Sequence, residues 1–341
     1  MSLFHFMPKP EYISIPPGTI QDEFTDLTPE EMAVIRGEAI SDKNLPNLSE
    51  RESTLISQSE QLNRDFFGDQ YDTLFSESIP RPNFSEQVWQ YLEKRELAAY
   101  YLPDIQFPEI TKDTNIPAYI KTLETIYPNW LLPEKLFFDR IKEYQTTNPP
   151  IGISPTSLTL KGGWRFIETV QKPNYQTQND TYTQRYPVTS LMTDIANSIQ
   201  RDNQALSHKL ESGDRFGITW TEITGNEVDS KGKLTGKRTN RGITDYASQV
   251  LNNPARLPIE LEWSILANFQ VYQEKHQKPA PNDGLGSTNT WEWLEDERPY
   301  SDGDVSRLRA GSSGSGGLRV VSSDRPSGRD VNVGFRLFGS D

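Results

Sequence analysis

The chain of 341 residues contains no cysteine and only 3 histidines. Without thiols it cannot form disulfides, thiolate nucleophiles, zinc–thiolate sites or iron–sulfur clusters. His5, His208 and His276 are far apart and none forms an i, i+4 pair, so we expect neither a histidine metal site nor a cofactor. No apolar run approaches the roughly 18 residues that a membrane-spanning helix needs, so the sequence predicts no membrane partner.

Positive charge is also in short supply, since the formal net charge is -13. Such a field repels the phosphates of nucleic acids and of anionic membranes, and we expect neither as a partner. The N-terminus lacks the basic start and long apolar core of a secretory signal. We therefore expect a cytoplasmic protein, or one that reaches the outside by lysis, by virion assembly or by another non-classical route.

Catalytic signatures are missing as well. Gly311-Ser-Ser-Gly314 has neither the spacing nor the following helix of a nucleophile elbow, and there is no phosphate-binding loop. The carboxylate pairs Glu260/Glu262 and Glu292/Glu295 could be offered as acid–base pairs. An acidic chain always contains such pairs, however, and a structural role is favoured for Glu260, Glu262 and Glu292. The residues alone predict no active site.

Three regions with different patterns make up the chain. Residues 1–80 are rich in proline and acidic residues, which predicts an extended, partly disordered arm with one short helix starting at Thr28. Residues 81–150 have helical apolar periodicity. A Pro-rich break over residues 148–155 then separates this helical region from the rest.

Residues 151–341 combine strand and helix patterns, which predicts an α+β domain. Expected strands cover residues 158–160 and 164–170, and residues 225–241 read as a polar loop. Expected helices cover residues 188–200 and 243–251, and a third begins at Pro258.

The most informative segment is residues 307–338. It is rich in Gly and Ser like a linker, yet it ends in Val333-Gly-Phe-Arg-Leu-Phe338, an apolar run with strand propensity. A flexible linker has no reason to end this way. The pattern indicates a surface of small residues held between fixed apolar and Arg anchors, which suits recognition better than catalysis.

Five segments, in order, carry a resemblance to a known family. Ala255-Arg-Leu-Pro-Ile-Glu-Leu-Glu-Trp263, Asn289-Thr-Trp-Glu-Trp293 and residues 307–338 resemble motifs of the formylglycine-generating enzymes and their C-type-lectin-like relatives. Residues 162–175 and 213–220 resemble the subgroup that serves as variable proteins of diversity-generating retroelements. The resemblance covers about residues 158–338. It implies a C-type-lectin-like C-terminal domain, preceded by the mainly helical region and the arm.

The same resemblance separates binders from enzymes. The formylglycine-generating branch works through a cysteine pair and the sulfoxide-synthase branch through a histidine iron triad, and this chain can supply neither. What remains is similar to the non-enzymatic binder branch. We expect a phage tail or virion protein that binds a protein or glycan receptor on a host or target cell. A cellular variable binding protein and a cysteine-less lectin-fold enzyme are the alternatives.

In the retroelement families, randomised codons cannot encode Lys, Glu, Gln, Met or Trp. None of these residues occurs between Ala310 and Asp341, although the whole chain is rich in Glu, Lys and Gln. The resemblance therefore implies a variable tip over residues 312–332 that binds ligand. Its candidate variable positions are Ser312, Gly314, Ser315, Arg319, Val320, Ser322, Ser323, Arg325, Ser327, Gly328, Asp330 and Asn332.

A fixed frame is expected around these positions, because exposed residues tolerate replacement only where buried anchors supply the folding energy. The frame candidates are Gly316, Gly317, Leu318, Val321, Arg329, Val333, Phe335 and Arg336. The core candidates are Trp263, Trp291, Trp293, Leu318, Val321 and Phe335. Arg329 and Arg336 are expected to pair with carboxylates among Glu260, Glu262, Glu292 and Glu295.

The first Gly of the family's Arg-Gly-Gly run is replaced here by Ala310, which requires a negative φ at that residue. The tip has no Tyr, Trp or Phe from Gly311 to Val333. Affinity per site is therefore expected to be modest, and a homo-oligomer would raise avidity. Residues 1–80 are expected to dock on neighbouring virion or tail subunits.

Overall fold

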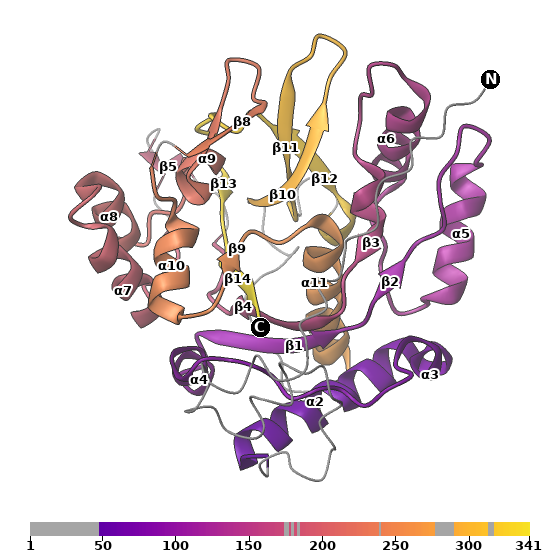
Figure 1. Cartoon of the computed structure of the whole chain (residues 1–341), viewed down its shortest axis with the longest axis horizontal. Helices are drawn as coiled ribbons and strands as arrows, with labels where there is room; N and C mark the ends of the chain where they lie inside the picture. Colours follow the sequence, from indigo (N-terminus) through magenta and orange to yellow (C-terminus); the bar gives the residue numbers. More distant parts are fainter. Residues whose placement is uncertain are drawn as a thin grey trace, which may run out of the picture. The chain divides into compact units, whose positions relative to one another are not determined.

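Two four-stranded sheets organise the chain (Figure 1). The computed structural model describes residues 48–173, 177–178, 181–182, 185–238, 240–276, 290–312 and 317–341. The first sheet has the order β1-β4-β14-β9, with every neighbouring pair antiparallel. Its strands are β1 (Leu97–Leu102), β4 (Gly163–Glu168), β14 (Phe338–Ser340) and β9 (Ala255–Arg256).

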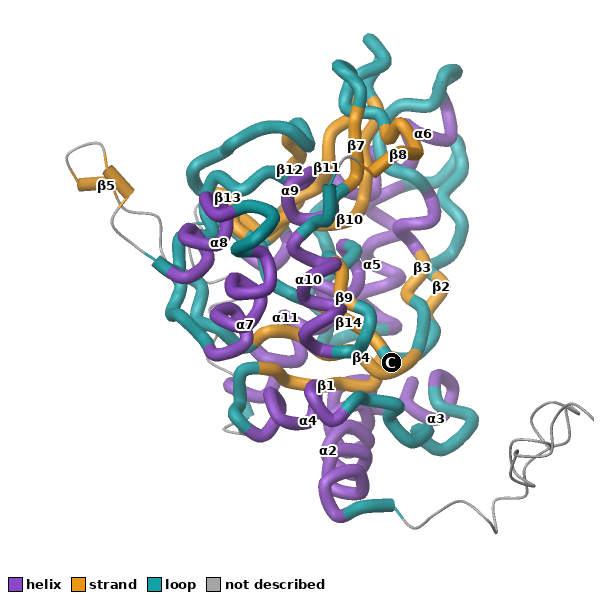
Figure 2. The backbone as a smooth tube through the Cα atoms, turned by 60° about the vertical axis from the view of Figure 1, so that its left-hand side comes forward, coloured by secondary structure: helices purple, strands orange, loops and turns teal. Residues whose placement is uncertain are grey.

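The second sheet has the order β12-β11-β10-β13 and carries the segment singled out above. Strand β11 is antiparallel to both β10 and β12, whereas β10 and β13 run parallel. Its strands are β10 (Trp291–Pro299), β11 (Val305–Ala310), β12 (Val321–Asp324) and β13 (Val333–Gly334). In both ribbon views β10, β11 and β12 lie toward one end of the molecule and β1 and β4 toward the other (Figures 1 and 2).

Three two-stranded sheets complete the strands of the described residues. They pair β2 (Ile105–Gln106) with β3 (Thr159–Leu160), β5 (Thr177–Gln178) with β6 (Thr181–Tyr182), and β7 (Asn226–Val228) with β8 (Leu234–Arg238).

Helices surround the two large sheets (Figure 1). Beside β1 lie α2 (Glu50–Phe67), α3 (Tyr71–Leu74) and α4 (Glu86–Glu93). One side carries α5 (Ile116–Ile126) and α6 (Lys135–Thr146), and the other carries α7 (Ser190–Ile199), α8 (Gln204–Glu211), α9 (Trp220–Thr224) and α10 (Ile243–Leu251). Between them runs α11 (Glu260–Lys275). Single 3-10 turns are η2 (Gly68–Gln70), η3 (Pro155–Leu158) and η5 (Gly317–Arg319).

The helical periodicity expected within residues 81–150 is confirmed by α4, α5 and α6. Ser85 caps α4 by accepting a hydrogen bond from the Val88 amide at 3.1 Å. Asn115 caps α5 in the same way, and proline follows within its first turn. The helices expected over 188–200, over 243–251 and from Pro258 are α7, α10 and α11. With both helices and strands present, the chain is an α+β protein. The short helix expected at Thr28 lies outside the described residues.

Two local expectations are corrected. Residues 97–102, in the stretch expected to be helical, form strand β1, because all six of its residues pair with β4 from Leu97↔Glu168 to Leu102↔Gly163. The long-range ladder outweighs the weak local preference of Ala and Leu for helix. The expected polar loop over residues 225–241 contains the β7–β8 hairpin, whose β8 residues are all exposed.

The arm expected over residues 1–80 ends earlier than its composition suggested. Helix α2 is polar overall, but Leu62, Phe66 and Phe67 are buried at its C-terminal end. The Phe66 ring packs edge-on against the Phe269 ring of α11, with centroids 4.8 Å apart. One-sided burial of a few aromatic residues therefore holds a mostly polar helix in the core.

Residues 50–341 form one compact unit. The boundary expected near residue 150 does not separate cores, because Trp130 is buried with residues of α11 and its Nε1 donates to the Ser264 hydroxyl at 3.0 Å. Among the described residues, no helix is both long and apolar enough to cross a membrane.

Candidate functional site

The candidate tip, residues 312–332, leaves strand β11 and returns to β13. Beyond residues 313–316, which lie outside the described residues, the chain makes the η5 turn and pairs β12 with β11 from Arg307↔Asp324 to Ala310↔Val321. It then turns through Arg325–Gly328, where the Gly328 amide donates to the Arg325 carbonyl at 2.8 Å. Backbone pairing therefore fixes the path of β12 without help from its side chains.

The expected core beneath the tip is confirmed. Trp263, Trp293 and Phe335 are almost completely inaccessible, and Trp291, Leu318 and Val321 are also buried. Each buried aromatic side chain removes a large apolar area from water. These anchors supply folding energy that does not depend on which residues occupy the exposed positions above them.

Gly311 has a backbone that only glycine accommodates easily. Its φ is +92° and an added Cβ would lie 2.5 Å from an atom of the Trp263 ring. Ala310 is not among the described residues with positive φ, so the requirement for a negative φ at this departure from the family pattern is met. Ala is therefore tolerated at position 310, whereas position 311 requires Gly because its backbone has a positive φ and lies against the Trp263 indole.

A buried polar network joins three distant segments below the tip. The Arg336 guanidinium donates from Nε to Glu292 Oε1 at 3.2 Å, and both side chains are 1 % exposed. Glu292 Oε2 accepts from the Trp263 indole at 2.9 Å. Burial pushes the pKa of Glu292 up, but the charges of Arg336 and Lys172 and these hydrogen bonds outweigh it, so the net pKa is lowered. Glu292 is therefore a buried carboxylate whose charge is held by its partners.

The expectation for Arg336 is confirmed, but the one for Arg329 is wrong. Arg329 is exposed and pairs with Glu222 of α9 at 2.5 Å, while its Nη1 donates to the Gly217 carbonyl at 3.0 Å. No role was expected for Glu222 from the sequence. Its role as a partner depends on where the tip folds back, which no local signal reports.

The other expected partner carboxylates have separate roles. Glu262 binds Arg165 at 3.1 Å and Arg256 at 2.6 Å. Glu260 is fully buried and neither of its side-chain oxygens has a hydrogen-bond partner. Burial, together with the nearby Asp296 and Glu134, raises the pKa of Glu260 well above its usual value. Burial without a hydrogen-bond partner therefore disfavours the charged form of Glu260. Within the described ranges, no group of three or more acidic or histidine side chains is placed to hold a metal.

The candidate variable positions differ in exposure. Arg325 and Ser327 are exposed. Partly exposed positions are Arg319, Ser322, Ser323, Gly328, Asp330 and Asn332. Ser312 and Val320 are buried, contrary to the exposure expected of a replaceable residue, because both lie where the chain passes over the core. Gly314, Ser315 and the frame residue Gly316 lie outside the described residues.

Several partly exposed side chains are held by neighbours. Arg309 of β11 binds both Asp324, at 3.3 Å, and Asp330, and lies over the Trp291 ring at 5.0 Å. The Ser323 hydroxyl is 2.8 Å from the Tyr300 hydroxyl. Among the candidate variable positions that the structure describes, Arg325 and Ser327 in the turn are the exposed ones, and Arg325 pairs with Asp304 at 3.3 Å.

Two surface hollows flank the Arg329–Glu222 pair. The first, called here the polar hollow, has a volume of about 380 Å³ and is lined by Asn203, Leu206, Thr221, Glu222, Gly225, Asn226, Glu227, Val228, Asn240, Arg241 and Ser327. The second, called the basic hollow, has a volume of about 300 Å³ and is lined by Arg185, Lys209, Asp214, Phe216, Gly217, Arg329 and Val331. The tip thus borders a hollow on each side.

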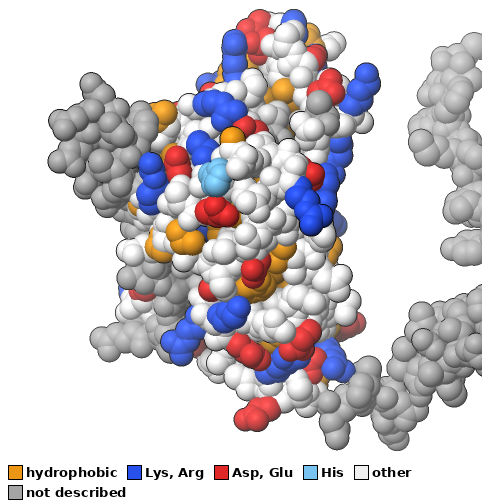
Figure 3. Space-filling model, turned by 90° about the vertical axis from the view of Figure 1, so that its left-hand side faces the viewer, with side chains coloured by type: hydrophobic (Ala, Val, Ile, Leu, Met, Phe, Trp, Pro, Cys, Tyr) orange, Lys and Arg blue, Asp and Glu red, His pale blue; other side chains and the backbone are white. Residues whose placement is uncertain are grey.

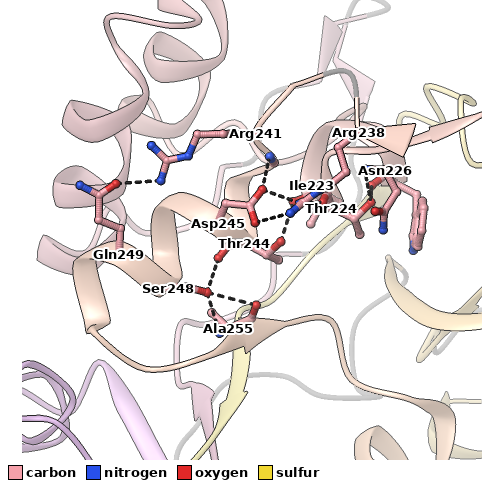
Figure 4. Close-up of polar contacts among 12 residues, drawn as sticks. Ile223, Thr224, Asn226, Arg238, Arg241, Thr244, Asp245, Ser248, Gln249 and Ala255 are labelled. Atoms are coloured by element: carbon pink, nitrogen blue, oxygen red, sulfur yellow. Dashed lines mark hydrogen bonds and ion pairs between the residues drawn. The ribbon is translucent and has the colours of Figure 1, made fainter. Parts of the chain in front are cut away.

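The β7–β8 hairpin that borders the polar hollow is tied down by one arginine (Figure 4). The Arg238 guanidinium donates to both carboxylate oxygens of Asp245, at 2.9 and 2.5 Å, and to the Thr224 carbonyl. The Gly242 amide also donates to Asp245, at 2.7 Å. This cluster links β8 to α9 and α10. Only the polar, Lys-rich composition of this stretch was evident before the fold was known.

The chain was compared with protein families, curated proteins and solved structures. No family model, no curated protein and no solved structure matches the chain.

Proposed function

We propose that the chain is a non-enzymatic ligand-binding protein that presents the tip, residues 312–332, on a C-type-lectin-like scaffold. Its favoured setting is a phage tail or virion, where the tip binds a receptor on the host cell. The observation that carries the proposal is the meeting of three motif segments at one point. Trp263, Glu292 and Arg336, each from a different segment, are joined by hydrogen bonds directly below the strands that lead into the tip.

Such a network is what a binder with a replaceable surface requires. The scaffold must keep its fold while tip residues change, so its stability has to come from groups that the tip does not include. The paired β4 and β14 strands add to the support, because they close the scaffold by joining its last strand to an early one. A sheet-borne tip then projects from a closed scaffold, in the way antibody loops project from a framework.

The exposure of the 325–328 turn is consistent with fixed anchors and replaceable surface positions, whereas Ser312 and Val320 are buried. At Arg325 and Ser327, which face solvent, replacement is expected to change stability by no more than about 0.5 kcal/mol. The anchors Leu318, Val321 and Phe335 are buried, and truncating one of them removes roughly 2–5 kcal/mol. Residue replacement is therefore tolerated at the turn and strongly destabilising at the anchors.

Two display libraries test the tolerance of the tip. The first randomises Arg325, Ser327 and Gly328, and the second randomises Leu318, Val321 and Phe335. We expect most members of the first library to fold, as measured by protease resistance, and few of the second. Equal survival of both libraries would contradict the proposal, since it requires fixed and replaceable positions to alternate.

Binding is tested on intact cells. The wild-type chain, a tip variant (Arg325→Glu with Ser327→Tyr) and a control variant, Arg201→Glu, are applied to a panel of bacterial cells. Arg201 is exposed and lies outside the tip. We expect capture on at least one strain, lost in the tip variant and kept in the control. Capture that the tip variant retains would refute a working role for the tip.

The neighbouring DNA tests diversification separately. We expect a reverse transcriptase gene and a near-copy of the segment encoding residues 307–338 that differs from it at adenines. Tail genes nearby would favour the virion setting, and their absence beside such a cassette would favour a cellular binder.

A further inference from the structure

One arginine that touches the tip has no carboxylate partner. On the face that carries α7 and α8, Lys and Arg side chains lie interspersed with Asp and Glu (Figure 3). Near the tip, Arg309 pairs with Asp324 at 3.3 Å, and Arg329 pairs with Glu222 at 2.5 Å. Among the described residues, by contrast, no carboxylate pairs with Arg298 of β10. The fold therefore leaves the charge of Arg298 without a counterion.

Two uncharged side chains hold Arg298 in place. Its guanidinium carbon lies over the Tyr300 ring, 4.5 Å from the ring centroid, and its Nη1 donates to the Ser323 hydroxyl at 3.4 Å. The Ser323 hydroxyl is in turn 2.8 Å from the Tyr300 hydroxyl. Contact with an aromatic ring attracts a guanidinium without removing its charge. One cation and two hydroxyls therefore converge, and all three side chains are partly exposed.

The surroundings of Arg298 make its charge unfavourable. Its Nε is buried and donates no hydrogen bond. Burial lowers the pKa of the Arg298 guanidinium and the nearby Arg140 adds to this, whereas Tyr300 and Glu143 oppose it. Glu143 is itself bound to Arg140 at 2.5 Å, so it does not act as the counterion of Arg298. A partly buried cation without a counterion costs stability, and a bound anion would relieve that cost.

The register of the sheet brings Arg298 to the tip. Arg298 pairs with Ser306 of β11, and Ser323 of β12 pairs with Leu308 of β11. Side chains of every second residue lie on the same face of a sheet, and so do those of directly paired residues. Arg298 and Ser323 therefore share one face, on either side of β11. Because β10 lies outside residues 312–332, the cluster joins a candidate variable position to a residue outside the tip.

We propose that Arg298, Tyr300 and Ser323 form a subsite, called here the arginine subsite, that binds a side-chain carboxylate of a receptor protein. This inference rests on the proposed function and specifies its partner. A carboxylate accepts strong hydrogen bonds from a guanidinium and from hydroxyls, and would supply the counterion that Arg298 lacks.

The composition of the arginine subsite favours a protein partner. Arginine and tyrosine are enriched among the residues that dominate binding at protein interfaces. The tip has no Tyr, Trp or Phe from Gly311 to Val333, and Tyr300 supplies from outside the tip the aromatic contact that recognition loops usually contain. Neither Arg298 nor Tyr300 lines the polar hollow or the basic hollow. A surface patch of this kind suits a side chain that projects from a protein, whereas small molecules usually bind in enclosing clefts.

Titration with short peptides tests the arginine subsite directly. The probes are acetyl-Gly-Glu-Gly-amide, its neutral counterpart acetyl-Gly-Gln-Gly-amide, and N-acetylneuraminic acid as an acidic sugar, with binding followed by NMR chemical shifts. We expect the Glu peptide to bind with a Kd in the millimolar range, more tightly than the other two probes, and its affinity to fall as salt rises. No binding of the Glu peptide, or equal binding of the Gln peptide, would overturn the proposal. Tighter binding of the acidic sugar would refute the assignment to a protein partner.

Matched variants locate the site. Arg298→Gln is expected to weaken binding of the Glu peptide about tenfold, the effect of losing one charge-assisted hydrogen bond. Tyr300→Phe keeps the ring contact but loses the hydroxyl, and should weaken binding less. Arg201→Gln makes the same charge change at an exposed residue outside the tip and should leave the affinity unchanged. Circular dichroism shows whether each variant keeps the fold. Equal weakening by Arg201→Gln would mean that general attraction binds the peptide.

A carboxylate placed within the chain provides an independent test. Ser323→Asp should pair with Arg298, raise the urea midpoint of unfolding and abolish binding of the Glu peptide. Ser78→Asp makes the same charge change at an exposed residue outside the tip and should do neither. Arg298→Met removes the unpaired charge, so its midpoint should not fall below that of the wild type. Lower midpoints for both Ser323→Asp and Arg298→Met would show that the charge is already compensated, which would overturn the proposal.

Cell capture separates this inference from the proposed function. We expect Arg298→Gln to lose capture of the strain that the wild-type chain binds, as the tip variant does. If the tip variant loses capture while Arg298→Gln retains it, the arginine subsite does not bind the receptor, yet the tip remains a binding surface. Failure of capture by the wild-type chain counts against the proposed function alone, because the peptide titration does not depend on it.

Discussion

Replacing Arg336 by Met tests whether the buried network below the tip holds the scaffold together. The guanidinium donates to Glu292 at 3.2 Å and to the carbonyls of Glu168 and Val170 at 2.7 and 3.0 Å. Arg336→Met keeps much of the side-chain volume but removes every one of these bonds. It leaves Glu292 as a carboxylate that is 1 % exposed, with the cationic Arg336 gone.

The expected cost follows from that burial. Removing one partner of a buried ion pair costs about 3–5 kcal/mol. Lys172 also lowers the pKa of Glu292 and remains in the variant, so we expect a value toward the lower end of this range. The double variant Glu292→Gln/Arg336→Met removes the buried carboxylate, and the Gln oxygen still accepts from Trp263. The buried Lys172 ammonium keeps its hydrogen bond to the Gly311 carbonyl. The double variant loses chiefly two hydrogen bonds to carbonyls, for a total of about 2 kcal/mol.

Urea unfolding at pH 7, followed by tryptophan fluorescence, measures both values. Arg325→Met serves as the control, because it makes the same substitution at an exposed tip position and should lie within about 0.5 kcal/mol of the wild type. Two results would refute the reasoning. Either Arg336→Met costs less than about 1 kcal/mol, or the double variant is as unstable as the single one.

Three other variants probe the tip and its support. Gly311→Ala should cost about 2–4 kcal/mol in urea unfolding, through the positive φ and the clash with Trp263; a cost below 1 kcal/mol would contradict that geometry. Val320→Asp buries a charge and should unfold the chain at temperatures where Arg325→Asp stays folded, as circular dichroism would report. Burial raises the pKa of Glu260 in the folded state. The contribution of Glu260 to the stability of the wild type is therefore complete below the unfolded-state pKa and is lost as pH rises through the folded-state pKa. Glu260→Gln should therefore gain stability relative to wild type as pH rises above about 4.3, and a pH-independent difference would disprove this.

Local signals predicted the parts of the fold that depend on near neighbours. The apolar periodicity within residues 81–150 predicted helices there, because residues three and four apart share one helix face, and α4, α5 and α6 form in that range. Strand β1 was not foreseen, because Leu97-Ala-Ala-Tyr-Tyr-Leu102 has weak intrinsic preference and becomes a strand only by pairing with β4. Helix α2 was missed for a related reason, since its few buried aromatic residues find their partners on α11.

For the candidate site, the sequence predicted the anchors better than the surface. The segment of small residues contains three large apolar side chains, those of Leu318, Val321 and Phe335. Apolar side chains of this size are usually buried, and all three are buried here. Exposure of the intervening positions could not be predicted in the same way. Val320 is buried beside its partly exposed neighbour Arg319, because the η5 turn rather than strand alternation sets its direction.

Composition is enough to exclude thiol chemistry, and the apolar segments indicate which residues are buried. Absence of cysteine is a property of composition, and apolar anchors leave water whatever the fold. The pairing of charges depends instead on how the chain folds. Arg336 pairs with Glu292, Arg329 pairs with Glu222 rather than the expected partners, and the Glu260 carboxyl oxygens accept no hydrogen bond. Many Arg–Glu pairs are equivalent along an acidic chain, and the choice among them depends on long-range backbone geometry that no local pattern encodes.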